Sequence, residues 1–184
     1  MSKPQKYMFV SDIHGNIDVF NEIIEIFNKE EADKLVFLGD TGASYYDEEN
    51  NRAIADILNE MDNKVELIRG NCDRSNFEDL LEFVLYDDDT LYINGRFVTI
   101  THGHLNGNYY LPEYCGEIYI QGHTHVPVLE KQGSYILANP GSPSRPRGMN
   151  IKCYIIIDEK SISLKSFSGE TLKSIDFWGF KSKE

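Results

Sequence analysis

Two histidines stand one residue apart in the segment IYIQGHTHVPV, directly after an apolar run that is typical of a β-strand. A strand has little structural use for two imidazoles at its end, so His123 and His125 indicate that a ligand is held there. All five histidines of the chain follow runs of strand character, and none falls on a helix face, where a buried structural histidine would be the default. The other three are His14, His102 and His104.

Acids and an amide stand at the same strand ends. Asp12 comes two residues before His14, Asp40 ends the segment VFLGD, and the segment LIRGNCD supplies Asn71 and Asp73. Any one of these segments is compatible with a surface turn, because Asn, Asp and Gly favour turns. The ordered series Asp-x-His, Gly-Asp, Gly-Asn, His-Gly-His and Gly-His-Thr-His is difficult to produce as scattered turns. Together these residues predict a metal site with imidazole and carboxylate ligands.

The elements that must position these residues alternate through the first half of the chain. Short apolar runs and helical periods follow one another, which is the pattern of a parallel β-α-β sheet. Ligands of such sheets bind at the carboxyl ends of the strands, where the polar residues fall. We expect strands at residues 6–10, 34–38 and 65–69 and helices at 17–27 and 51–61.

The second half of the chain predicts antiparallel pairing. Asn94-Gly95 between two β-rich runs is a strong hairpin signal. The acidic run at residues 87–89 is interpreted as a solvated turn. The expected fold is α/β: a mixed sheet, parallel and then antiparallel, that forms a two-layer sandwich flanked by helices, in a single domain spanning residues 1–184. Further strands are expected at 117–120, 126–130, 135–137, 152–157 and 161–167.

The composition limits the partners that we expect. A chain of 184 residues with 41% hydrophobic residues suits one domain with a full core. The formal charge of −12 argues against a nucleic-acid polymer, because no basic stripe exists to neutralise phosphates. Three cysteines without a CxxC pair, at 72, 115 and 153, favour neither disulfides nor a cysteine zinc site. The absence of a membrane-spanning stretch or signal-peptide core predicts a cytoplasmic protein without a membrane partner; a homo-oligomer is compatible with the sequence.

Six segments give the chain a resemblance to the calcineurin-like metallophosphoesterases, and within them to the small single-domain bacterial and archaeal phosphodiesterases. The segments run in the family's order over most of the chain. They are SDIHGN (11–16), LGD (38–40), GNCD (70–73), THGH (101–104), GHTH (122–125) and NPGS (139–142). The resemblance implies the family's fold, a double β-sheet sandwich flanked by helices.

The resemblance also implies two metal ions that share the carboxylate of Asp40. His123 and His125 would then bind different ions, about 3.5–4 Å apart, and Gly122 is expected to give their turn its backbone freedom. Imidazole and carboxylate ligands favour Mn, Fe, Ni, Zn or Co over Mg or Ca, and Mn is our first candidate. One ion would be held by Asp12, His14, Asp40 and His125, and the other by Asp40, Asn71, His102 and His123.

The activity that the resemblance implies is hydrolysis of a phosphate ester, above all of a small phosphodiester. A water that bridges both ions would lose a proton near neutral pH and attack phosphorus in line. Alternatives are a phosphomonoesterase or protein phosphatase on the same site, and a non-catalytic scaffold like the retromer subunit that shares the fold. Every expected ligand is present here, which favours an enzyme. The candidate catalytic residues are Asp40, Asn71, Cys72, Asp73 and His104.

The group that protonates the leaving group stays open between two residues. Many relatives have a histidine where this chain has Cys72, and a thiol near two cations is a doubtful proton donor because the positive field favours thiolate. A small buried cysteine without a role is the alternative. His104 is the second candidate, either as the acid or as a side chain that holds a metal ligand in place.

Two residues are candidates for binding the substrate. Asn16 follows the first motif, although its position as N-cap of the helix at 17–27 already explains it. Arg145 stands in the Pro/Gly-rich segment NPGSPSRPR and could pair with phosphate. For Arg147, in the same segment, a plain surface role is expected.

Overall fold

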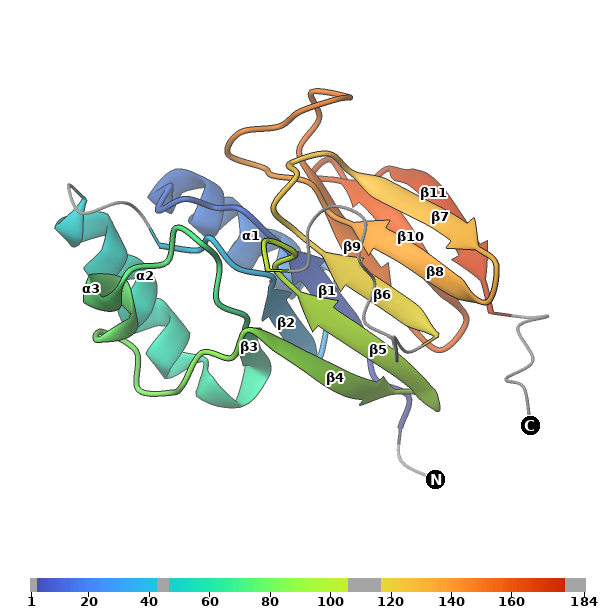
Figure 1. Ribbon diagram of the computed structural model, residues 1–184, viewed down its shortest axis with the longest axis horizontal. Coiled ribbons are helices and arrows are strands. Elements are labelled where there is room, and N and C mark those ends of the chain that lie inside the picture. The colour runs from blue at the N-terminus through green and yellow to red at the C-terminus, as the bar shows by residue number, and fades with distance from the viewer. Residues whose placement is uncertain (1–2, 43–46, 106–116, 178–184) are drawn as a thin grey trace.

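Two β-sheets pack face to face in the computed structural model of the chain, and the helices cover the outer face of one sheet (Figure 1). The structure describes residues 3–42, 47–105 and 117–177, and only the backbone of Asp62. Cys115 lies outside these residues, whereas Cys72 and Cys153 are free thiols. Within these residues, no helix has both the length and the apolar character needed to cross a membrane. The two-layer α/β architecture predicted from the sequence is confirmed.

The six-stranded sheet joins the parallel first half of the chain to its antiparallel end. Its strand order is β11-β10-β9-β1-β2-β3, in which β1, β2 and β3 run parallel and β9, β10 and β11 are antiparallel. The strands are β1 (Tyr7–Val10), β2 (Lys34–Phe37), β3 (Val65–Leu67), β9 (Cys153–Ile157), β10 (Ser161–Ser166) and β11 (Thr171–Asp176). Of these, only β11 was not predicted.

The five-stranded sheet has the order β4-β5-β6-β8-β7. Its three central strands are parallel and each edge strand is antiparallel to its neighbour. The predicted hairpin joins β4 to β5, with φ of 49° at Asn94 and 88° at Gly95, the two positive values that a type I′ turn requires. The strands are β4 (Asp88–Ile93), β5 (Arg96–Thr101), β6 (Ile118–Gln121), β7 (Val128–Gln132) and β8 (Tyr135–Asn139).

The acidic run at residues 87–89 is not the turn that the sequence predicted. Asp88 and Asp89 are the first residues of β4, and their side chains are exposed at the edge of the sheet. Asp87, just before the strand, pairs with Arg69 at 3.2 Å. Charges on an edge strand are compatible with β structure because they discourage pairing with another chain. An acidic run therefore does not separate a solvated turn from a solvated edge strand.

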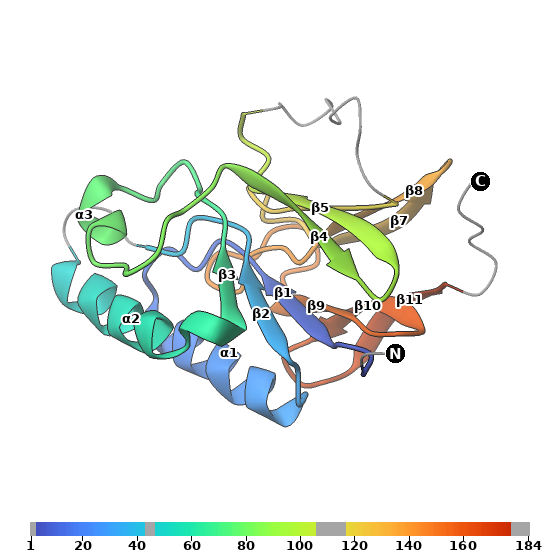
Figure 2. The same cartoon turned by 90° about the horizontal axis from the view of Figure 1, so that it is seen from below.

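Alternate residues of the central strands enter two different cores. Tyr7 and Phe9 of β1 pack against the five-stranded sheet, whereas Met8 and Val10 pack against the helices. Figure 2 shows the six-stranded sheet between these two layers. A strand buried on both faces has an unbroken apolar sequence, which explains why β1 and β2 were predictable.

The helices begin at side-chain caps. The Asn16 side chain accepts the Val19 N–H at 3.1 Å at the start of α1 (Ile17–Lys29), as predicted. Helix α2 (Glu48–Glu60) begins three residues earlier than predicted, because Asp47 caps it by accepting the Asn50 N–H. A 3₁₀ turn η1 (Asp62–Lys64) leads into β3, and a single helical turn α3 (Ser75–Glu78) follows the GNCD segment.

Candidate metal centre

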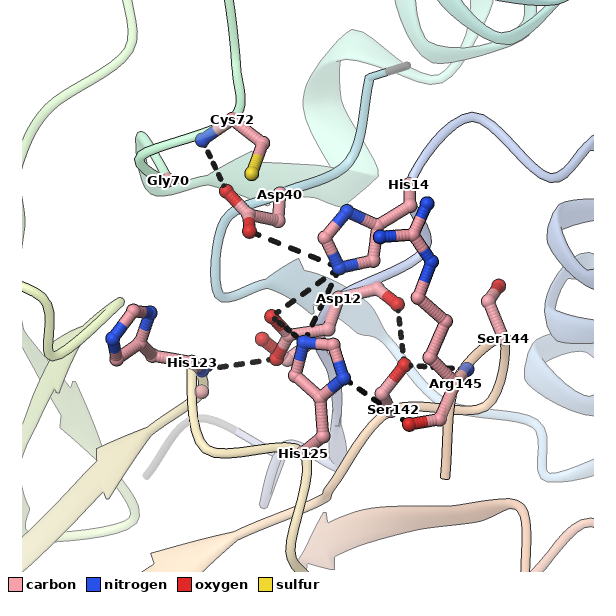
Figure 3. A network of polar contacts seen from close by, with 12 residues as sticks. Asp12, His14, Asp40, Gly70, Cys72, His123, His125, Ser142, Ser144 and Arg145 are labelled. Atoms are coloured by element: carbon pink, nitrogen blue, oxygen red, sulfur yellow. Dashed lines mark hydrogen bonds and ion pairs between the residues drawn. The ribbon is translucent and has the colours of Figure 1, made fainter. Parts of the chain in front are cut away.

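Loops from both sheets meet at one edge of the sandwich and bring the motif residues together (Figure 3). These loops follow β1, β2 and β3 in one sheet and β5, β6 and β8 in the other. The backbone joins neighbouring loops: the Asp12 N–H donates to the Gly39 carbonyl at 3.0 Å and the His14 N–H to the Asp40 carbonyl at 2.8 Å. The site is therefore formed by backbone segments that support one another, and the side chains project from them.

Asp12, His14 and His125 form the first cluster. The two Nε2 atoms of the histidines lie 3.2 Å apart, and Nε2 of His125 lies 3.3 Å from Oδ1 of Asp12. That Oδ1 is buried and has no hydrogen-bond partner within the described residues. The other carboxylate oxygen accepts the His123 N–H at 3.0 Å. An unpaired carboxylate oxygen beside two converging imidazole nitrogens is an arrangement that a bound cation would stabilise.

The hydrogen bond of His125 leaves the lone pair of its Nε2 directed into this cluster. Its Nδ1 lies 3.1 Å from the carbonyl oxygen of Arg145, and because a carbonyl only accepts, Nδ1 must carry the proton. The lone pair of a neutral His125 therefore sits on Nε2, facing His14 and Asp12. A backbone carbonyl that fixes a histidine in this way is typical of metal ligands.

Asp40 and His102 form the centre of a second cluster. His102 donates from Nδ1 to the Leu38 carbonyl at 2.7 Å, which leaves its Nε2 facing Oδ2 of Asp40 at 3.5 Å and Oδ1 of Asn71 at 3.1 Å. The same Oδ2 lies 3.8 Å from Nε2 of His14. The Asp40 carboxylate thus stands between the two clusters, where a shared ligand would be.

His123 lies on the side of the second cluster. Its ring centroid is 5.1 Å from that of His102, whereas the ring of His125 is 5.1 Å from that of His14. The two histidines of GHTH therefore face different neighbours, which supports the predicted division between two ions. Their roles as ligands stay a prediction.

Cys72 is placed against the carboxylate of Asp40. Its N–H donates to Oδ1 of Asp40 at 2.7 Å, and its sulfur accepts from Nδ2 of Asn71 at 3.2 Å. Ligand atoms of Cys72, Asp40 and His14 all lie within 4.8 Å of one another. Burial and then the negative charge of Asp40 raise the pKa of the thiol to about 11. The thiol therefore borders the site, close enough to act on a bound group.

Asp73 lies behind Asp40 with its carboxylate directed at the backbone. Its Oδ2 accepts the N–H groups of Asp40 at 2.9 Å and of Gly70 at 2.8 Å, and its Oδ1 accepts that of Gly42 at 2.8 Å. Burial raises the pKa of Asp73 to about 6, against the effect of these donors. The side chain ties the loops after β2 and β3 together, which is a positioning role.

The remaining pKa values reflect the closeness of acids and imidazoles. Burial acts to raise the pKa of Asp40, but the hydrogen bond and charge of His102 hold it well below its usual range. Burial acts to lower the pKa of His102, but Asp40 raises it. Burial lowers the pKa of the three other affected rings, which favours the neutral form that can bind a cation. These are His14, His104 and His123.

The backbone of the site is strained at the residues that carry the candidate ligands. Positive φ is uncommon for residues other than glycine and clusters at functional sites. Five of the motif residues have a positive φ: Asp12 at 58°, His14 at 53°, Asp40 at 51°, His123 at 67° and His125 at 63°. The sequence gives no signal for this feature, because none of these residue types demands it.

Glycine is required at position 122 for a different reason from the backbone freedom that we expected. Its φ is not positive; the two histidines after it take that conformation instead. A Cβ at Gly122 would lie 1.9 Å from Oγ of Ser11, so the residue must be glycine because its loop passes against the segment that follows β1. Gly70 is similar, since its Cβ would lie 2.1 Å from the Asp40 nitrogen. Each of these glycines lets its own loop approach a neighbouring loop closely: Gly122 the loop of Ser11, and Gly70 the loop of Asp40.

The other candidates lie around this centre. The ring centroid of His104 is 5.3 Å from that of His102, and its buried Nδ1 has no hydrogen-bond partner within the described residues. Asn16 is exposed and its side-chain oxygen caps α1. Arg145 is exposed, and its side chain extends alongside His14 in Figure 3.

Sequence reasoning missed the side chains that hold the loop after β8 against the site. Ser142 Oγ donates to the Asp12 carbonyl at 2.7 Å, and Ser144 Oγ donates to the Ile13 carbonyl at 2.7 Å. Asn139 donates to the Gly122 carbonyl at 2.8 Å. The NPGS segment was a signal of importance, but its partners lie far away in the sequence.

Comparison with known proteins gives a consistent result. The model of a calcineurin-like phosphoesterase superfamily domain matches residues 6–161. The chain is similar to the phosphodiesterase YfcE of Escherichia coli strain K12, with 34% identity over 174 residues that cover 91% of this chain and 95% of that protein. The solved structure of this E. coli phosphoesterase superposes with a TM-score of 0.81 at 32% identity, over 92% of this chain and 98% of that one. A zinc-complexed Vps29 from Entamoeba histolytica shares the fold at 16% identity, with a TM-score of 0.62 over 94% of this chain and 99% of that chain.

Proposed function

The chain belongs to the calcineurin-like phosphoesterase superfamily, and on that premise we propose that it hydrolyses small phosphodiesters at a site for two divalent transition-metal ions. The observation that carries the proposal is the pair of clusters on either side of Asp40. Its Oδ2 lies 3.8 Å from Nε2 of His14 in one cluster and 3.5 Å from Nε2 of His102 in the other.

The donor set fits metal ions. The described residues offer three groups of side chains whose ligand atoms converge, drawn from Asp12, His14, Asp40, Cys72, His102 and His125. Imidazole with carboxylate favours Mn, Fe, Ni, Zn or Co, and we keep Mn as the first candidate. When bound, two such ions supply Lewis acidity that stabilises the phosphoryl oxygens and lowers the pKa of an attacking water.

The residues of the chain contribute position and protons. Backbone carbonyls hold His102 and His125 with Nε2 toward the site, and Asp73 holds the loop that carries Asp40. Cys72 and His104 stand beside the centre as the two groups that could give the departing oxygen its proton. General acid catalysis of this kind is typically worth about 10²–10⁴-fold. Of Cys72 and His104, the proton donor is the residue whose replacement slows the hydrolysis of esters with poor leaving groups.

We propose further that the chain acts as a single domain on small esters in the cytoplasm. Residues of both sheets share one apolar core, which supports the single domain. The charge of −12 disfavours a nucleic-acid polymer as substrate. The location rests on the sequence alone.

Metal content and hydrolysis together test the proposal. Elemental analysis of the purified protein should give two transition-metal ions per chain, and a panel of phosphodiesters and phosphomonoesters with Mn²⁺ or Ni²⁺ should show turnover, fastest with diesters. A scaffold of the same fold would turn over none of them. Asp40→Asn should weaken both metal sites together, so full metal content with full activity in this variant would show that Asp40 does not bridge.

A further inference from the structure

The backbone N–H and the backbone carbonyl of Arg145 are both hydrogen-bonded to residues of the candidate metal centre or its supporting loop. Its N–H donates to Ser142 Oγ at 2.9 Å, and the same hydroxyl donates to the Asp12 carbonyl at 2.7 Å. Its carbonyl accepts Nδ1–H of His125 at 3.1 Å. The backbone of Arg145 is therefore held in position relative to two loops that carry candidate ligands, although its side chain is exposed.

The guanidinium group is directed along the His14 side of the centre. Figure 3 shows the side chain rising from the loop and passing beside the His14 ring. Burial is the main influence on the pKa values of His14 and Cys72, and the positive charge of Arg145 acts downward on both, which agrees with this position. The guanidinium therefore stands near the space that the His14 and Cys72 side chains border.

Arg145 differs from the paired arginines of the molecule. Arg69 binds Glu78 at 2.8 Å, and Arg96 binds Glu117 at 2.7 Å. The guanidinium of Arg145 makes no ion pair or hydrogen bond with any residue that the structure describes. A guanidinium presents several N–H donors in a planar fork, and an anion with two adjacent oxygens matches that fork.

The charge of the whole chain makes a local cation useful. A formal charge of −12 repels an anionic ester over most of the surface. An arginine at the rim offers the phosphate a partner that is charged at every relevant pH.

We propose that Arg145 binds the non-bridging oxygens of the substrate phosphate on the His14 side of the centre. This inference rests on the proposed function, because it names a substrate contact of the same site. Since the contact exists in the bound ester as well as in the transition state, its loss raises KM more than it lowers kcat. The residue binds substrate and holds no metal ion.

The experiment compares Arg145→Gln and Arg145→Lys with Arg147→Gln, which removes another exposed charge from the same loop. Calorimetry measures the Kd of inorganic phosphate for metal-loaded protein, and hydrolysis of bis(p-nitrophenyl) phosphate gives KM and kcat. Loss of a charge-assisted hydrogen bond predicts a roughly 10–100-fold weaker phosphate Kd and higher KM for Arg145→Gln. Arg145→Lys should fall between this variant and wild type, because it keeps the charge but loses the fork. Arg147→Gln should stay within about twofold of wild type, as a solvated surface charge does.

Three outcomes overturn the inference. Equal effects of the two glutamine variants would show only the general field of the surface. An unchanged phosphate Kd in Arg145→Gln would show no contact, and a reduced metal content would show that the residue acts through His125 instead. Absence of turnover in the metal-loaded wild type would refute the proposed function, whereas the phosphate calorimetry would still decide whether Arg145 binds the anion.

Discussion

Replacement of Asp73 by asparagine should destabilise the protein and weaken its metal sites together. The carboxylate accepts three backbone N–H groups, with Oδ2 bound to Asp40 and Gly70 and Oδ1 bound to Gly42. An asparagine side chain has one oxygen, so its best orientation keeps the two donors that share Oδ2. Its amide nitrogen then faces the Gly42 N–H, donor against donor, in a position that is buried.

The size of the effect follows from these contacts. One buried donor without a partner costs about 1–3 kcal/mol, and each retained bond loses strength because its acceptor is no longer charged, by about 0.5–1 kcal/mol. Burial disfavours the charged form of Asp73 and raises its pKa to about 6, so removal of the charge offsets part of this loss. We therefore expect the free energy of unfolding to fall by about 2–3 kcal/mol for Asp73→Asn.

Urea unfolding in the presence of a chelator measures the change without a contribution from bound metal. The midpoint should fall while the slope with urea concentration stays constant. Asp56→Asn is the matched control, because Asp56 is exposed on α2, and it should change the free energy by less than about 0.5 kcal/mol. Metal affinity should fall in Asp73→Asn but not in the control. A loss of stability below about 0.5 kcal/mol, or unchanged metal affinity, would refute the positioning role.

Three further experiments test other parts of the molecule. His125→Ala and His123→Ala should each lose a different ion in anomalous diffraction, since their rings face different clusters; loss of the same ion from both would contradict the division. Cys72→Ser and His104→Asn should differ in their effect on alkyl diesters relative to nitrophenyl diesters, and the proton donor is the residue whose loss slows only the poor leaving group. Against burial, which acts to raise it, hydrogen bonds from two lysines and a tyrosine hold the pKa of Glu30 at about 2, from a usual value of 4.5. Because the pKa of Glu30 is lower in the folded state than in the unfolded chain, its ionised carboxylate stabilises the fold at pH values above about 4.5. The free energy of unfolding should therefore fall as the pH drops from about 4.5 to about 2, by roughly 1–2 kcal/mol after screening. A Glu30→Gln variant should lack this part of the pH dependence.

The predictable part of the fold is the part whose sequence pattern has one physical explanation. β1 is apolar at every position because it separates two cores, and the Asn94-Gly95 turn supplies the positive φ values of its hairpin. β11 (Thr171–Asp176) escaped prediction because its residues are mostly exposed and polar at the edge of the sheet. The turn α3 (Ser75–Glu78) is too short to show a helical period.

The candidate site divides in the same way. Each motif names its own polar side chains, so the residues that converge could be proposed from the sequence. The hydrogen bonds of Ser142 and Ser144 could not, because they join residues 130 and 131 positions apart. Asp73 was proposed as a catalytic residue, and only the structure shows that its carboxylate is directed at the backbone. A motif reveals which residues gather, whereas the direction of each side chain depends on the loops around it.

The strained backbone connects these observations. Each non-glycine residue in the left-handed region costs about 1–2 kcal/mol, so the five at the centre together cost about 5–10 kcal/mol, comparable with the whole stability of a domain. The two apolar cores and the hydrogen bonds between the loops must offset that cost. Gly70 and Gly122 allow those bonds, because any larger residue would push the loops apart by collision with Asp40 or Ser11. The glycines and the strained residues therefore act together: Gly70 and Gly122 let the loops close on each other, and the closed loops hold Asp40 and His123 in a left-handed conformation that such residues rarely adopt.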